Sequence, residues 1–199
     1  MEDTFKTIEK PSEGLFKDKG SRFISYAFPV DSEEMIKEIV HSIKKEHHSA
    51  RHHCYAWRLG ANKLIFRVND DGEPSSSAGK PILGQIQSFD LSNILIVVVR
   101  YFGGTLLGVS GLINAYRNAA LDAIQQAVII ERLVENNLLV EFDYSVMNEV
   151  MKIFKDEKLP QVDPKFDLCC KIKTHIRLSD SERVEQGLLK IDTVKVMSL

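Results

Sequence analysis

The chain has 199 residues, of which 44% are hydrophobic and 27% charged, and its formal net charge is −2. These values are typical of a soluble globular protein with one large or two small domains, and they exclude a global electrostatic attraction to nucleic acid or acidic lipid. No hydrophobic signal segment opens the sequence, and the longest aliphatic run, 94–99, is far shorter than the roughly 20 residues of a membrane helix. The cysteines lack C-x-x-C spacing, so we expect a reduced, cytoplasmic protein without a disulfide framework or a zinc knuckle.

The first clear elements are a strand at 22–29 and a helix after it. Asp31 is the expected N-cap of this helix, with Glu34 three residues later completing a capping box. Apolar residues between Met35 and Ile43 recur at helical spacing, which predicts one buried face.

Two short β-rich runs, 54–59 and 64–69, flank the residues GANK and predict a hairpin. In the first run the aromatic residues Tyr55 and Trp57 share one face, for which core packing is the favoured interpretation.

A short helix is expected near 78–89, where Pro81 would lie in the first turn. The segment 93–102 is apolar on both faces and predicts a central buried strand. A glycine-rich turn then leads into a long helix whose apolar stripe runs from Val109 to Ala127.

The last third has a simpler order. Residues 128–136 are interpreted as a connector, and the elements expected after it follow the ferredoxin-like order β-α-β-β-α-β. These are a strand at 138–144, a helix at 146–156, two strands within 160–178, a helix at 179–187 and a strand at 191–197. We therefore predict an α+β protein with two domains, 1–130 and 137–199.

The hairpin brings two polar segments together. A four-residue loop would pair Cys54 with Asn69, His53 with Asp70 and His52 with Asp71, so that ARHHC lies beside DDGEP. Basic and acidic side chains at this separation of about 5 Å are expected to pair.

Four interpretations of this cluster remain open. A zinc or manganese site suits the residue types, but His52 and His53 must face opposite sides of the strand, which leaves few ligands. Acid/base catalysis by His53 with Asp70 or Glu73 is a second possibility, although no G-x-S-x-G nucleophile is present.

The third interpretation is an anion cradle. The glycines Gly72 and Gly79 are too far apart for a nucleotide-binding P-loop, and Pro81 replaces its final hydroxyl residue. Serine hydroxyls and backbone N–H groups ahead of a helix still suit a phosphate. The fourth interpretation is an ion-paired loop that only stiffens the edge of the sheet.

A second polar and aromatic segment is Arg100-Tyr101-Phe102, which ends the predicted buried strand at a glycine turn. A cation beside two aromatic rings suits stacking on bases and contact with phosphates, and it equally suits the edge of a core.

Three blocks carry a resemblance to a known family. ARHHCYAW, DDGEPSSSAGKPIL and VVVRYFGGTLLGVSGLINAY lie in this order within residues 50–116, and together they resemble the signature of the IMPACT/YigZ family. The resemblance covers nearly the whole chain. It implies an N-terminal domain like domain 2 of ribosomal protein S5 and a ferredoxin-like domain like the C-terminal domain of elongation factor G.

The resemblance implies a link to translation. Eukaryotic members regulate translation under amino-acid starvation, and they do so with an additional N-terminal partner-binding domain. This sequence starts at the core domain, so we expect the short bacterial form and do not carry the starvation role over. No catalytic residues are transferred from the family.

We therefore expect a cytoplasmic, non-enzymatic binding protein, without a cofactor or metal, that contacts the ribosome, tRNA or other structured RNA. A protein partner is also compatible with the sequence, whereas a membrane partner is not expected. The acids Asp70, Asp71 and Glu73 would orient the basic residues. The expected binding residues are Arg51, His52, His53, Ser75, Ser76, Lys80, Arg100 and Tyr101. The alternative is a hydrolase that uses the His/Asp/Glu cluster, with or without a metal, on a phosphate-bearing substrate.

Overall fold

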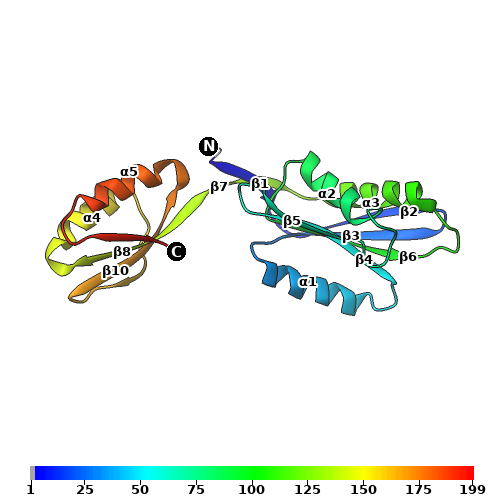
Figure 1. Ribbon diagram of the computed structural model, residues 1–199, viewed down its shortest axis with the longest axis horizontal. Helices are drawn as coiled ribbons and strands as arrows, with labels where there is room; N and C mark the ends of the chain where they lie inside the picture. Colours follow the sequence, from blue (N-terminus) through cyan, green and yellow to red (C-terminus); the bar gives the residue numbers. More distant parts are fainter. Residues whose placement is uncertain (1–2) are drawn as a thin grey trace. The chain divides into compact units, whose positions relative to one another are not determined.

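The computed structural model describes residues 3–199, and these divide into two compact units (Figure 1). The larger unit comprises residues 5–132, and the smaller unit combines residues 3–4 with residues 133–199. Both units mix helices with antiparallel sheet, so the prediction of a two-domain α+β protein is confirmed.

The larger unit is built on a five-stranded sheet with the order β2-β3-β6-β4-β5. All of its neighbouring strands run antiparallel. The strands are β2 (Ser12–Asp18), β3 (Ser21–Pro29), β4 (His52–Leu59), β5 (Ile65–Asn69) and β6 (Ile94–Tyr101). The prediction of a central buried strand is confirmed in β6, where every residue before Tyr101 is buried.

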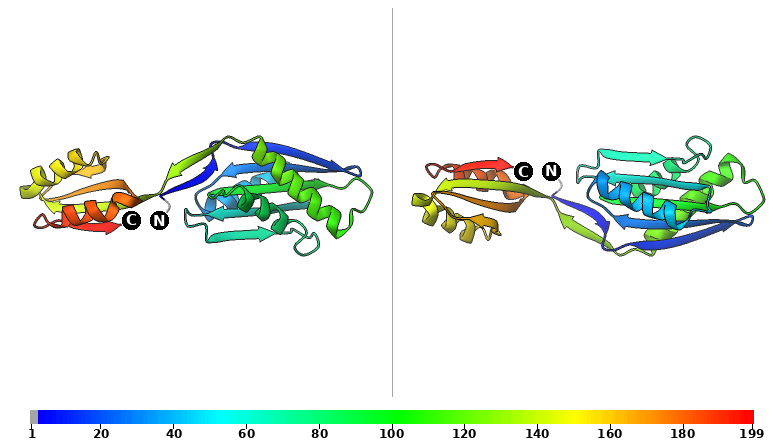
Figure 2. Two further views of the ribbon diagram at one scale, coloured as in Figure 1. Left: turned by 90° about the horizontal axis from the view of Figure 1, so that it is seen from above. Right: turned by 90° about the horizontal axis from the view of Figure 1, so that it is seen from below.

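Three helices cover the two faces of this sheet. Figure 2 shows α2 (Gly79–Ser88) and α3 (Gly108–Gln125) over one face and α1 (Glu33–Glu46) over the other. The core under α2 and α3 includes Phe23 and Tyr116, whereas the core under α1 includes Trp57. The interpretation of Trp57 as a core residue is therefore confirmed, since 4% of its surface is exposed.

Two details of these helices differ from the sequence-based expectation. The N-cap of α1 is Ser32, not Asp31, and its hydroxyl donates to the Asp31 carboxylate instead of capping the helix. In α3, Val109 is 53% exposed because the buried face runs through the small residues Ala115 and Ala119.

The β4–β5 hairpin forms as predicted, but its register is shifted by one residue. Tyr55, and not Cys54, pairs with Asn69. The physical reason is that Leu64 stays in the loop with 75% of its surface exposed. The loop closes through a hydrogen bond of 3.0 Å from the Lys63 N–H to the Gly60 carbonyl, and both residues have positive φ.

The sequence did not predict three of the strands that the structure contains. β2 forms an edge of the main sheet, and β1 (Thr4–Ile8) pairs with β7 (Ile129–Leu133) in a separate two-stranded sheet. Residues 128–136, interpreted as a connector, contain β7, and the border between the two units falls within them, after Arg132. Most side chains of β7 are exposed, so the segment lacks the alternating pattern that marks a half-buried strand.

The smaller unit has the predicted order of elements. Its sheet order, β11-β8-β10-β9, is that of a ferredoxin-like fold, and α4 and α5 cover one face (Figure 1). A core that includes Val140, Phe154 and Leu188 fills the space between helices and sheet. The elements are β8 (Glu135–Asp143), a short 3-10 turn (Tyr144–Val146), α4 (Met147–Asp156), β9 (Val162–Lys165), β10 (Cys169–Arg177), α5 (Leu178–Leu189) and β11 (Lys195–Ser198).

None of the helices among residues 3–199 has both the length and the apolar composition needed to cross a membrane.

Candidate functional site

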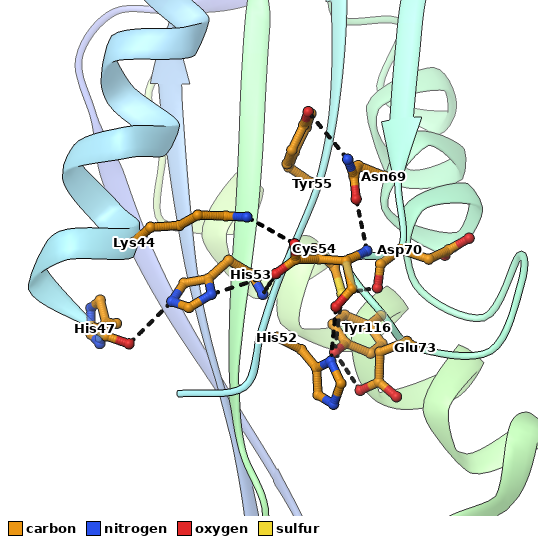
Figure 3. A network of polar contacts seen from close by, with 11 residues as sticks. Lys44, His47, His52, His53, Cys54, Tyr55, Asn69, Asp70, Glu73 and Tyr116 are labelled. Carbon is orange, nitrogen blue, oxygen red and sulfur yellow. Dashed lines mark hydrogen bonds and ion pairs between the residues drawn. The ribbon is translucent and has the colours of Figure 1, made fainter. Parts of the chain in front are cut away.

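The polar residues singled out in the sequence surround the start of β4 and the loop that follows β5, residues 70–78 (Figure 3). Asp71 lies at the centre of one side of this region. One oxygen of its carboxylate accepts a hydrogen bond of 2.7 Å from the His53 backbone N–H, and the other accepts one of 2.8 Å from Lys44 Nζ. Burial acts to raise the pKa of the Asp71 carboxyl, but the hydrogen bonds from Lys44 and His53 outweigh it and hold the pKa below its usual value.

The two adjacent histidines face opposite sides of β4, as the strand geometry predicts. His52 Nδ1 lies 2.9 Å from the Asp71 backbone oxygen, and His53 Nε2 lies 3.1 Å from the His47 backbone oxygen (Figure 3). A carbonyl oxygen only accepts hydrogen bonds, so in each pair the ring nitrogen is the donor. Within residues 3–199, no three His, Cys, Asp or Glu side chains are grouped so that they could hold a metal ion.

The Asp70 carboxylate binds backbone N–H groups of the loop and of the start of α2, and not a basic side chain. One oxygen of its carboxylate accepts from the Ser76 N–H at 2.8 Å, and the other accepts from Ala78 at 3.0 Å and Gly79 at 2.8 Å. These donors include the first N–H groups of α2, where the helix dipole also favours a negative charge. The serine-glycine segment thus has the donors expected of an anion cradle, and the carboxylate of Asp70 occupies them.

Glu73 and Arg100 form a buried ion pair on the other side of β4. Arg100 Nη1 donates to Glu73 Oε1 at 2.7 Å, and the two side chains are 8% and 4% exposed. The Tyr116 hydroxyl donates to the same oxygen at 2.8 Å, and the Cys54 thiol donates to the Tyr116 oxygen at 3.3 Å. Arg100, expected on the surface to meet phosphates, is therefore buried, because Glu73 reaches it from the loop.

The buried groups of this network are poorly suited to nucleophilic catalysis. Burial is the main cause that raises the pKa of the Cys54 thiol and of the Tyr116 hydroxyl far above their ordinary values. Both groups are therefore protonated at neutral pH, and a thiol rather than a thiolate is a weak nucleophile.

The other predicted binding residues differ in how far they are exposed. Arg51, Ser75 and Lys80 are exposed, whereas His52, Ser76 and Tyr101 are half-buried and His53 is buried. The Tyr101 hydroxyl is hydrogen-bonded to His47 Nδ1 at 2.8 Å, and the Arg22 guanidinium lies 5.2 Å from the centre of its ring.

Several exposed cations lie around the end of β6. Of these, only Arg51 was predicted from the sequence as a binding residue. Register places Arg22 beside Tyr101, and it places His52, which follows Arg51, beside Arg100. The C-terminal end of α1 and the β2–β3 turn reach the same place through His47 and Gly20. We name the exposed residues Lys19, Arg22, Lys45, Arg51 and Phe102 the sheet-end surface.

The sheet-end surface combines unpaired charge with an exposed ring. Within residues 3–199, no acidic side chain forms an ion pair with any of its four cations. Phe102 follows the strand directly and is 54% exposed. Sequence reasoning missed Lys19, Arg22 and Lys45 because the β2–β3 turn and the end of α1 meet the end of β6 only in the fold.

Comparison with known proteins gives one family match and several relatives. The model of the Impact N-terminal domain matches residues 19–124, which include β3 to β6, α1, α2 and all of α3 except its last residue. The IMPACT family member YvyE of Bacillus subtilis (strain 168) is 27% identical over 195 residues, which are 98% of this chain and 90% of YvyE.

The IMPACT family member YigZ of Escherichia coli (strain K12) is 44% identical over 110 residues, and this match spans 54% of each chain. A crystal structure described as that of a hypothetical protein aligns with a TM-score of 0.77 and 26% identity. That alignment covers 100% of this chain and 98% of the other.

Proposed function

Since the chain belongs to the IMPACT family, we propose that it is a cytoplasmic binding protein linked to the regulation of translation. The larger unit would contact structured RNA, in the ribosome or in tRNA, through the sheet-end surface. Regulation of translation is the role that membership of this family implies, and the sheet-end surface is the feature that supports contact with RNA.

The single observation that carries this proposal is that the sheet-end surface combines four cations without an ion-pair partner within residues 3–199 and an exposed aromatic ring. Lysine and arginine side chains that lack an internal counter-charge can neutralise phosphates. An exposed ring such as Phe102 offers a stacking platform for an unpaired base. The net charge of −2 means that such contact would depend on this local surface rather than on the protein as a whole.

This proposal changes the set of residues expected from the sequence. Arg51 remains, Ser75 is exposed in the neighbouring loop, and Lys80 is exposed in the first turn of α2. Arg100 and His53 would act indirectly, since they help to hold the loop and the end of α1 in place. Asp71 and Glu73 keep the proposed orienting role, whereas Asp70 would orient the loop itself.

The enzyme alternative finds less support in the geometry. The carboxylates of Asp70, Asp71 and Glu73 each accept at least two hydrogen bonds from the protein itself. A general base needs a lone pair that points toward a substrate, and these hydrogen bonds direct part of each carboxylate toward the protein.

The experiment that tests the proposal is binding to purified ribosomes and to tRNA at several salt concentrations. The triple variant Arg22→Ala, Lys45→Ala and Arg51→Ala removes three cations of the sheet-end surface. The plot of log affinity against log salt has a negative slope, and each lost phosphate contact makes it shallower by about 0.7–0.9. The triple variant should therefore reduce the magnitude of the slope by about 2–3.

A matched control removes three exposed cations from the smaller unit, Lys152, Lys155 and Lys190, and should leave the slope unchanged. Equal affinity and equal slope for the triple variant and the unaltered protein would show that RNA does not bind at the sheet-end surface.

A further inference from the structure

A groove of the larger unit runs between α1 and the β4–β5 hairpin. Ile36, Val40, Tyr55 and Trp57 supply its apolar lining. Its volume of about 270 Å³ is below the roughly 300–1,000 Å³ of pockets that enclose small molecules. The groove is thus large enough for a few side chains and small for a free metabolite.

The strand beside this groove, β5, is an open edge of the sheet. Its exposed residues include Ile65 and Phe66, each 53% exposed, and Arg67. Within residues 3–199, no hydrogen bond joins the backbone of residues 65–67 to any segment other than β4. Backbone groups on this side therefore remain available to another strand.

The other edge of the same sheet is treated differently. At β2, the Leu15 backbone N–H donates to the Asp122 carboxylate at 2.8 Å, and the Ser12 hydroxyl donates to the Ala123 carbonyl at 2.7 Å. The last turns of α3 thus cover the β2 edge. The β5 edge has no such cover and also carries exposed apolar side chains.

The charge along the groove is positive. Lys37, His41 and Arg67 line it together with Lys44, whereas Glu33 is the acidic residue of the lining. Lys44 is paired with Asp71, and Lys37 lies 3.9 Å from Glu34 in an exposed pair, which contributes little. Arg67 is exposed and lies on the face of β5 that borders the groove, because it pairs with Trp57.

We propose that the β5 edge binds an extended acidic peptide segment of a partner protein, which adds to the sheet as a sixth strand. Every second side chain of such a peptide would point toward α1, where acidic groups meet Lys37, His41 and Arg67. The intervening side chains would pack on the side of Phe66. This surface is distinct from the sheet-end surface, so the proposal does not depend on RNA binding.

A peptide fits these observations better than a nucleic acid. The unpaired donors and acceptors of β5 match the backbone of another strand, and a phosphate backbone has no N–H groups to offer. Trp57 lies beneath α1 with 4% of its surface exposed, so its ring face is not open to a base.

The test uses a fluorescein-labelled eight-residue peptide of alternating glutamate and valine, with fluorescence anisotropy and the full chain. The peptide should bind, and Arg67→Glu should weaken the affinity about tenfold or more, because attraction becomes repulsion. A matched charge reversal on the far face, Arg117→Glu on the exposed side of α3, should leave the affinity unchanged. The peptide with alternate amide nitrogens methylated should not bind, since it cannot pair with a strand.

Other outcomes would overturn the proposal. These are no binding of the glutamate-valine peptide, equal binding of a lysine-valine peptide, or equal binding after N-methylation. If an oligouridylate bound instead and lost affinity in Arg67→Glu, the groove would be a nucleic-acid site. The fluorescence of Trp57, the one tryptophan of the chain, checks that each variant is folded.

Discussion

The buried ion pair between Glu73 and Arg100 makes a strong prediction about stability. Glu73→Ala leaves the Arg100 guanidinium, only 8% exposed, without its counter-charge, and it removes the acceptor of the Tyr116 hydroxyl. Loss of one partner of a buried pair costs about 3–5 kcal/mol, and an unsatisfied buried hydroxyl costs about 1–3 kcal/mol. Because the two effects share one carboxylate, they do not add fully, and we expect a loss of about 3–5 kcal/mol in the free energy of unfolding.

The assay is urea unfolding followed by tryptophan fluorescence. The only tryptophan, Trp57, lies in the core of the larger unit, so the signal reports on this unit and not on the smaller one. The control is Lys37→Ala, which removes an exposed pair with Glu34 and should change stability by at most about 1 kcal/mol.

A second variant separates the charge from the packing. Replacing both partners, Glu73→Leu with Arg100→Met, leaves no uncompensated charge and should be less destabilising than Glu73→Ala alone. A loss below about 1 kcal/mol in Glu73→Ala would refute the reasoning, and so would a double variant that is less stable than the single one.

Four further predictions concern glycines and Asp71 of the larger unit and the reactivity of two cysteines. Gly103→Ala should destabilise the protein by about 1–3 kcal/mol in urea unfolding, because the new methyl carbon would lie 1.9 Å from the backbone of the β2–β3 turn. Gly84→Ala, whose methyl group meets nothing within 4 Å on α2, should be neutral or stabilising. The lowered pKa of Asp71 means that its stabilisation is complete above its unfolded pKa of about 3.9 and is lost as the pH falls through the folded pKa. The stability difference between the unaltered protein and Asp71→Asn should therefore shrink below about pH 4, and a constant difference would contradict this. A thiol reagent at neutral pH should modify the exposed Cys169 within the native protein and Cys54 only after unfolding, as followed by mass spectrometry.

The sequence predicted most elements because hydrophobic periodicity decides them locally. The apolar run of β6 and the β-α-β-β-α-β order of the smaller unit needed no tertiary information. β1 and β7 escaped prediction because they are short and lack a regular alternation of apolar and polar residues, and they pair with each other across more than 100 residues of chain.

The candidate site was predicted as a neighbourhood and not as a set of contacts. The spacing around the hairpin placed the histidines beside the acids, and they lie near each other in the structure despite the one-residue shift in register. That Glu73 turns inward to Arg100 depends on how the loop crosses the end of the sheet, which no local pattern encodes. The sheet-end surface was hidden for the same reason, since Arg22 and Arg51 are distant in sequence.

The contacts of Asp70 have a consequence for how the loop after β5 responds to its surroundings. The loop resembles a receptor whose ligand is attached to it, because a tethered carboxylate competes with free anions at a very high effective concentration. Phosphate or acetate in solution therefore competes with it only weakly. Asp70→Gly would cut this tether, and the three N–H groups of Ser76, Ala78 and Gly79 would then face solvent. The free energy of unfolding of that variant should rise with added acetate or formate, because the added carboxylate would take the place of the missing Asp70 side chain.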